Sequence, residues 1–123
     1  MNMTATTVDR TILLSRILFW ITLTAVLFLA FSPNADIGPD FDQADKIKHA
    51  FAFSVLTLLY AFGYSTESIV VAGRMLLVGL FIEAVQYTLP YRDASALDVA
   101  ADAVGIAVAL LMIRKKRKIK SLS

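Results

Sequence analysis

Residues 94–113 read ASALDVAADAVGIAVALLMI, a run of 20 residues that is long enough to cross a bilayer as a helix. Two acidic residues interrupt the run, Asp98 and Asp102, and their spacing of four places both carboxylates on one face of such a helix. Gly105 and Ala109 continue this face, and small residues at four-residue steps let two helix backbones approach closely. We therefore expect this face to contact protein rather than lipid.

Three further apolar runs precede this one, and together they indicate the fold class. Residues 12–31, 47–64 and 68–89 are 20, 18 and 22 residues long, and a membrane-spanning helix needs roughly 17–25 residues. The chain of 123 residues is 58% hydrophobic, against about 45–50% in a typical soluble domain. The runs are too continuous for the alternating strands of a membrane barrel. The sequence predicts an all-α polytopic membrane protein, in which residues 1–123 form a single four-transmembrane-helix bundle.

The first run has an alternative interpretation as a cleaved signal peptide. The tripeptide Ala30-Phe31-Ser32 would offer a weak small-x-small cleavage site. However, 20 apolar residues are long for a signal core, and Pro33 follows them directly. We therefore prefer a membrane span.

The basic residues predict how the bundle is oriented. Six of the twelve Lys and Arg residues lie between positions 114 and 120, and Arg10 and Arg16 flank the first run on its N-terminal side. The connection 32–45 carries four aspartates and no basic residue. Because positively charged flanks stay in the cytoplasm, both termini are expected there and the connections 32–45 and 90–93 outside. We interpret the basic tail as a topology anchor, with anionic-lipid binding as an additional role.

Eight polar side chains near the predicted outer face form the candidate site. At about 1.5 Å per residue, Asp98 and Asp102 lie about 6 and 12 Å below the outer end of their span, and Glu83 about 9 Å below the end of its own. A charge at mid-bilayer costs roughly 2.5–3.5 kcal/mol, so these acids need a counter-charge, a hydrogen-bond partner, a metal or a proton. The candidate ligand-binding residues are Asp45, Lys46, His49, Glu83, Gln86, Arg92, Asp98 and Asp102.

The order of these residues resembles that of a known family. The motifs are D-K-x-x-H at 45–49, E-x-x-Q at 83–86, P-x-R at 90–92 and D-x-x-x-D-x-x-G at 98–105. No single motif is specific, but the ordered set resembles the VanZ-like family of small bacterial integral membrane proteins. Many members have Asn where Asp102 stands here, so no role of this residue is carried over from the family.

The resemblance covers about half of the chain and implies a context in the bacterial cell envelope. The namesake of the family is associated with low-level resistance to a glycopeptide antibiotic, teicoplanin. The family has no settled biochemical activity, and the resemblance does not imply that this protein confers resistance. Together with the charge distribution, it predicts a multi-pass protein of the bacterial cytoplasmic membrane.

The candidate residues also have structural interpretations. Helix capping, interfacial anchoring, interhelical hydrogen bonds and an ion pair of Arg92 with Asp93 or Asp98 would account for most of them. Two acids on one buried face, Asp98 and Asp102, exceed what helix association requires. Both the structural and the functional interpretation of the cluster are compatible with the sequence.

Three functional classes remain open. The first is a non-catalytic envelope protein whose outer polar pocket binds a lipid head group, a lipid-linked precursor or an amphiphile, with Lys46 and Arg92 facing phosphate. The second is a membrane-embedded hydrolase or transferase that acts on a lipid-linked substrate. The third is a small transporter, although no polar path through the inner half of the membrane is visible.

The second class would depend on four candidate catalytic residues, which would act as general acid and base or hold a divalent metal. The sequence predicts neither a cofactor nor a dedicated metal site, because the chain has one histidine and no cysteine. The expected partners are the lipid bilayer and a lipid head group or lipid-linked envelope precursor, and a homo-oligomer is left open. The net charge of +2 gives no support to nucleic-acid binding. The candidate catalytic residues are His49, Glu83, Asp98 and Asp102.

Overall fold

The computed structural model describes residues 3–33 and 43–122 of the chain. It contains four helices: α1 (Met3–Phe31), α2 (Ala44–Tyr64), α3 (Ser68–Thr88) and α4 (Ala96–Leu122). Each helix includes a segment that is long and apolar enough to cross a membrane. The prediction of an all-α, four-helix membrane protein is therefore confirmed. Three of the four aspartates in the acidic connection, at positions 36, 40 and 42, lie outside the described residues.

The helix boundaries agree with the predicted runs at most ends. α1 ends at Phe31 and α2 at Tyr64, as the sequence predicts. α1 begins well before the apolar run, and α4 continues through the basic tail to Leu122. The basic residues of the tail are therefore carried on a regular helix.

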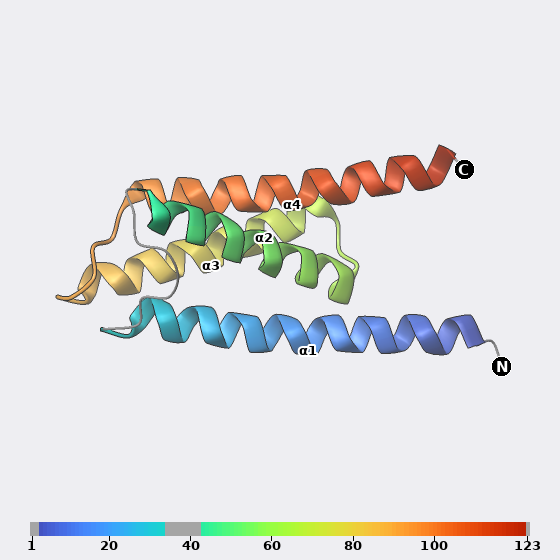
Figure 1. Ribbon diagram of the computed structural model, residues 1–123, viewed down its shortest axis with the longest axis horizontal. Coiled ribbons are helices and arrows are strands. Elements are labelled where there is room, and N and C mark those ends of the chain that lie inside the picture. Colours follow the sequence, from blue (N-terminus) through green and yellow to red (C-terminus); the bar gives the residue numbers. More distant parts are fainter. Residues whose placement is uncertain (1–2, 34–42, 123) are drawn as a thin grey trace.

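The four helices run alternately up and down, so both termini lie at the same end of the bundle (Figure 1). α2 packs most extensively on α4 and then on α1, and α3 packs on α4, α2 and α1. The end opposite the termini gathers the start of α2, the end of α3 and the start of α4 (Figure 1). This is the end where the sequence concentrates its polar residues.

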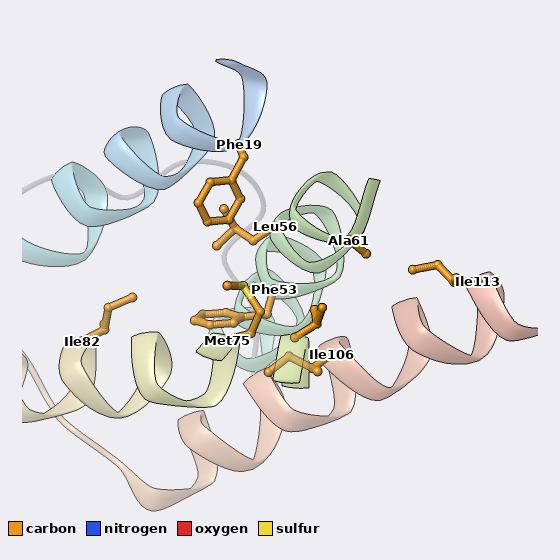
Figure 2. Close-up of a cluster of buried hydrophobic side chains, with 9 residues drawn as sticks. Phe19, Phe53, Leu56, Ala61, Met75, Ile82, Ile106 and Ile113 are labelled. Atoms are coloured by element: carbon orange, nitrogen blue, oxygen red, sulfur yellow. The ribbon is translucent and has the colours of Figure 1, made fainter. Parts of the chain in front are cut away.

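A buried apolar cluster joins all four helices (Figure 2). Phe19 of α1, Phe53 and Leu56 of α2, and Met75 of α3 are at most 2% exposed. Large apolar side chains also cover the outside of the helices, as expected of surfaces that face lipid. The buried cluster comprises Phe19, Phe53, Leu56, Ala61, Val71, Met75, Ile82, Ile106 and Ile113.

The contact between α2 and α4 depends on a glycine. A Cβ atom built at Gly105 would lie 2.2 Å from the carbonyl oxygen of Ala50, so a side chain at this position does not fit. The Ser54 hydroxyl donates to the carbonyl oxygens of Ala50 and Gly105, at 2.9 Å each. Asp98, Asp102 and Gly105 are all buried. The expectation that this face of α4 contacts protein is confirmed.

An aromatic cluster occupies the half of the bundle nearer the termini. The Tyr60 and Tyr64 rings stack with centroids 4.7 Å apart, and the Trp20 indole N–H donates to the Tyr64 hydroxyl at 2.8 Å. Arg16 donates to the Gly63 carbonyl at 2.7 Å, near the end of α2, where backbone carbonyls lack partners within the helix. The aromatic cluster is defined here as Arg16, Phe19, Trp20, Tyr60, Tyr64 and Arg74.

Candidate functional site

The sole histidine of the chain forms the centre of the site. His49 lies in the second turn of α2, and its Nδ1 is 2.8 Å from Oδ1 of Asp102 on α4. With Asp102 ionised, its carboxylate accepts and the imidazole Nδ1–H is the donor in this bond. Asp102 is completely buried. The close approach of α2 and α4 thus fixes the orientation of the imidazole.

A second aspartate of α4 lies on the other side of the ring. Oδ2 of Asp98 is 4.0 Å from His49 Nε2, and Oδ1 of Asp98 is 3.9 Å from the Lys46 ammonium. The Asp98 side chain is 4% exposed and that of Lys46 33% exposed. No hydrogen-bond donor reaches Asp98 Oδ1 from the described residues. A buried acceptor is therefore left with only a distant ammonium group.

Glu83 brings α3 to the same place. Its Oε2 accepts a hydrogen bond from the Ser95 backbone N–H at 3.0 Å, and its Oε1 is buried without a partner in the described chain. The carboxylate is close enough to His49, Asp98 and Asp102 to interact with them electrostatically. The sequence-based prediction that α2, α3 and α4 direct these groups toward a common site therefore agrees with the structure.

Asp45 completes the set from the first turn of α2. It is exposed, and it interacts electrostatically with His49 and Asp98. The polar cluster is defined here as Asp45, Lys46, His49, Glu83, Asp98 and Asp102.

The two remaining candidate residues bind the end of α1 instead. The Gln86 amide donates to the Ala30 carbonyl at 3.0 Å, and the Arg92 guanidinium donates to the carbonyls of Leu29, at 2.6 Å, and Ser32. The last carbonyls of a helix lack partners within it, and a cation is favourable at this end of the helix dipole. These hydrogen bonds link Gln86, near the end of α3, and Arg92, just after it, to α1. Gln86 Oε1 and Arg92 Nε are buried without a partner in the described residues.

Two further residues shape the site: Gly79, which the sequence places on the same helix face as Glu83, and Ser95, which sequence reasoning missed. A Cβ atom at Gly79 would lie 2.7 Å from Asp102 Oδ2, so this glycine makes room for the carboxylate. Ser95 precedes α4, where its hydroxyl accepts from the Leu97 N–H at 3.1 Å and its own N–H binds Glu83. A serine just before an apolar run is a helix-start signal, and Gly79 lies four residues before Glu83 on one helix face. Both signals were present in the sequence.

Asp45, His49 and Asp98 are the residues that could hold a metal ion. One ligand atom of each lies within 4.8 Å of the others. One imidazole and two carboxylates would suit a hard or borderline divalent ion. However, Asp45 is exposed and the Lys46 ammonium already faces Asp98, so the charge of this carboxylate is balanced in part without a metal. The geometry allows a cation but does not require one.

The arrangement has two chemical capabilities. The oriented imidazole presents Nε2 toward Asp98, as a general acid or base would. The buried carboxylate oxygens without donors form a site that hydroxyl or amine groups of a ligand would satisfy. No protein-family model matches the chain, and comparisons with curated proteins and with solved structures also found no match.

Proposed function

We propose that this chain is a VanZ-like protein of the bacterial cytoplasmic membrane, with both termini in the cytoplasm. The support is the ordered set of motifs between residues 45 and 105 and the basic tail at 114–120. With this orientation, the polar cluster belongs to the extracytoplasmic end of the bundle. We propose further that the cluster binds the head group of a lipid, a lipid-linked envelope precursor or a similar amphiphile.

One observation carries the proposal of binding: the cluster has buried acceptors without donors. Asp98 Oδ1, Asp102 Oδ2 and Glu83 Oε1 have no hydrogen-bond partner among the described residues. Leaving a buried acceptor unsatisfied costs about 1–3 kcal/mol. Three such atoms in one cluster favour a site that a ligand completes, because helix packing alone would be more stable without them.

The unpaired acceptors and the charged groups of the polar cluster indicate which ligand chemistry fits. The unsatisfied atoms are carboxylate oxygens, so the ligand would supply O–H or N–H donors, such as sugar hydroxyls or an amine. Lys46 is the only lysine or arginine of the polar cluster, and it would meet a phosphate next to these donors. Arg92 was expected to share this role, but its hydrogen bonds to Leu29 and Ser32 engage it with α1.

The test is to purify the full chain in mild detergent and to identify retained amphiphiles by native mass spectrometry. We expect the wild-type protein to retain a hydroxyl- or amine-bearing lipid and the variant Asp98→Asn to retain far less. The variant Asp93→Asn is the matched control, since it removes the same charge from an exposed position just before α4. Equal retention by wild-type and Asp98→Asn would contradict the proposal.

A specific observation also favours a second candidate, a membrane-embedded hydrolase or transferase. The Asp102–His49 hydrogen bond holds the imidazole in one orientation and leaves Nε2 for proton transfer. Incubation with labelled phospholipids or polyprenyl-linked substrates would distinguish the two functions. Turnover that is lost in His49→Gln would favour the enzyme, whereas retention of the lipid without turnover would favour the binding protein.

A further inference from the structure

A groove with a volume of about 460 Å³ lies at the other end of the bundle from the polar cluster. It is formed by the first residue of α3 and by one side of α4 from Ala107 to Arg117. Figure 1 shows these segments at the end of the bundle where the termini lie. The groove is lined by Ser68, Ala107, Leu110, Leu111, Arg114 and Arg117.

The lining changes from apolar to basic along α4. Ala107, Leu110 and Leu111 precede the two arginines at helical spacing, so all of them share one side of the helix. Leu111 is 61% exposed, and both arginines are exposed. Since α4 remains helical to Leu122, Arg114 and Arg117 have fixed backbone positions three residues apart.

The charge of this groove is not balanced by its own lining. None of the lining residues is acidic, and no ion pair of Arg114 or Arg117 occurs within residues 9–33 and 43–122, whose side chains the structure describes. Other arginines differ: Arg16 binds the Gly63 carbonyl and Arg92 binds the end of α1. The two groove arginines therefore remain available to an anion.

We propose that this groove binds an anionic phospholipid. The phosphate would lie between the guanidinium groups of Arg114 and Arg117, whose paired N–H donors can each bind two phosphate oxygens. The Ser68 hydroxyl is a further donor in the lining. An acyl chain would lie along Ala107, Leu110 and Leu111, toward the middle of the bundle.

The apolar part of the lining decides between a lipid and a soluble phosphate. A small phosphate compound would occupy the basic end and leave the side chains of Leu110 and Leu111 uncovered. A phospholipid covers both parts, because its phosphate and its acyl chain are joined in the order in which the groove presents its basic and apolar residues. The inference is independent of the proposed function, since it concerns the opposite end of the molecule.

The experiment measures lipid preference on the purified full chain by native mass spectrometry. Phosphatidylglycerol and phosphatidylcholine with identical acyl chains are added separately, and the bound fractions are compared. We expect the wild-type protein to prefer phosphatidylglycerol, and the double variant Arg114→Gln/Arg117→Gln to reduce this preference by about tenfold. The matched control is Lys115→Gln/Lys118→Gln, which removes the same charge from the same helix but from residues outside the lining.

The control determines whether the groove or the general charge of the tail is responsible. Retention of most of the preference in the lysine variant supports the groove, and an equal loss in both double variants overturns it. The variant Ala107→Trp fills the apolar part with both arginines intact, and it should also weaken phosphatidylglycerol binding. Competition by glycerol phosphate as strong as that by the lipid would overturn the choice of a phospholipid.

Discussion

The aromatic cluster and the polar cluster lie toward opposite ends of the bundle and differ in how completely their polar atoms are paired. In the aromatic cluster, Arg16, Trp20 and Arg74 each donate to an oxygen of the protein. In the polar cluster, Asp98, Asp102 and Glu83 each keep a buried carboxylate oxygen without a donor in the described residues.

This difference distinguishes polar groups that stabilise contacts between helices from polar groups that could bind a ligand. A paired donor and acceptor stabilise a helix contact by themselves, whereas an unpaired buried acceptor destabilises the fold until something satisfies it. Substitutions should therefore act on stability where the pairs are complete. They should act on ligand binding where the pairs are incomplete.

The largest effect is expected from Gly105→Ala, which would disrupt the polar cluster. The new methyl group would lie 2.2 Å from the Ala50 carbonyl oxygen and would force α2 away from α4, separating His49 from Asp102. We expect a loss of about 3 kcal/mol in the free energy of unfolding, near the upper end of the usual overpacking cost. Unfolding in mixed detergent micelles, followed by circular dichroism, measures this loss.

The control for this substitution is Gly73→Ala. No atom lies within 4 Å of a Cβ atom at Gly73, and alanine favours a helix over glycine. Gly73→Ala should be as stable as the wild-type protein or more so. Equal stability of the two alanine variants would contradict the close contact of α2 and α4.

The next effect compares the two aspartates of α4. Asp102→Leu removes the acceptor of the His49 N–H and should destabilise the protein by about 1–3 kcal/mol. Asp98→Asn removes a carboxylate whose Oδ1 has only the Lys46 ammonium at 3.9 Å, and partly exposed pairs of this kind contribute about 0–1 kcal/mol. The same unfolding assay should rank the variants in this order, and the reverse order would mean that Asp98 has a structural role.

A smaller effect is expected from substituting the two arginines that donate to backbone carbonyls at helix ends. Arg92→Gln removes the charged donor to the carbonyls of Leu29 and Ser32 and should cost about 1–2 kcal/mol. Arg16→Gln removes the corresponding bond to Gly63 and should cost a similar amount. Lipid retention at the polar cluster should survive Arg92→Gln in the fraction that remains folded. Loss of retention without loss of stability would place Arg92 in the binding site.

The smallest effect should come from Trp20→Phe. It keeps an aromatic ring beside Phe19 but removes the indole donor to the Tyr64 hydroxyl, at an expected cost of about 0.5–1 kcal/mol. Tyr87→Phe is the control, because this tyrosine is 84% exposed and should tolerate the change. A thermal scan in detergent that shows equal shifts for both variants would show that the Trp20 bond contributes nothing.

The sequence predicted the helices and the buried face of α4 well because both depend on local properties. The length of each apolar run determines a span, and the spacing of Asp98, Asp102 and Gly105 determines which face of α4 is buried. Periodicity gives the face and depth of a residue but not the helix that it meets. For this reason Arg92 was grouped with the acids, although the structure shows it bonded to the carbonyls at the end of α1.

The pairing of individual atoms within the site could not be predicted from the sequence. The motifs indicated that His49 and two aspartates lie toward the outer end of the bundle, but not that Asp102 takes the hydrogen bond while Asp98 Oδ1 remains without a donor. That choice depends on the closest approach of α2 and α4, which the backbone of Gly105 sets. The contribution of Ser95 was missed because its N–H, rather than its side chain, binds Glu83.

The most direct measurement is solid-state NMR of the bilayer-embedded protein, with ¹⁵N-labelled histidine and ¹³C-labelled aspartate carboxyl groups. The chain has a single histidine, so every imidazole signal belongs to His49. The structure predicts a measurable through-space dipolar coupling between Nδ1 and a carboxyl carbon, lost in Asp102→Asn and retained in Asp93→Asn. An imidazole with no coupled carboxyl carbon, or coupling that survives Asp102→Asn unchanged, would contradict the assembly of the polar cluster.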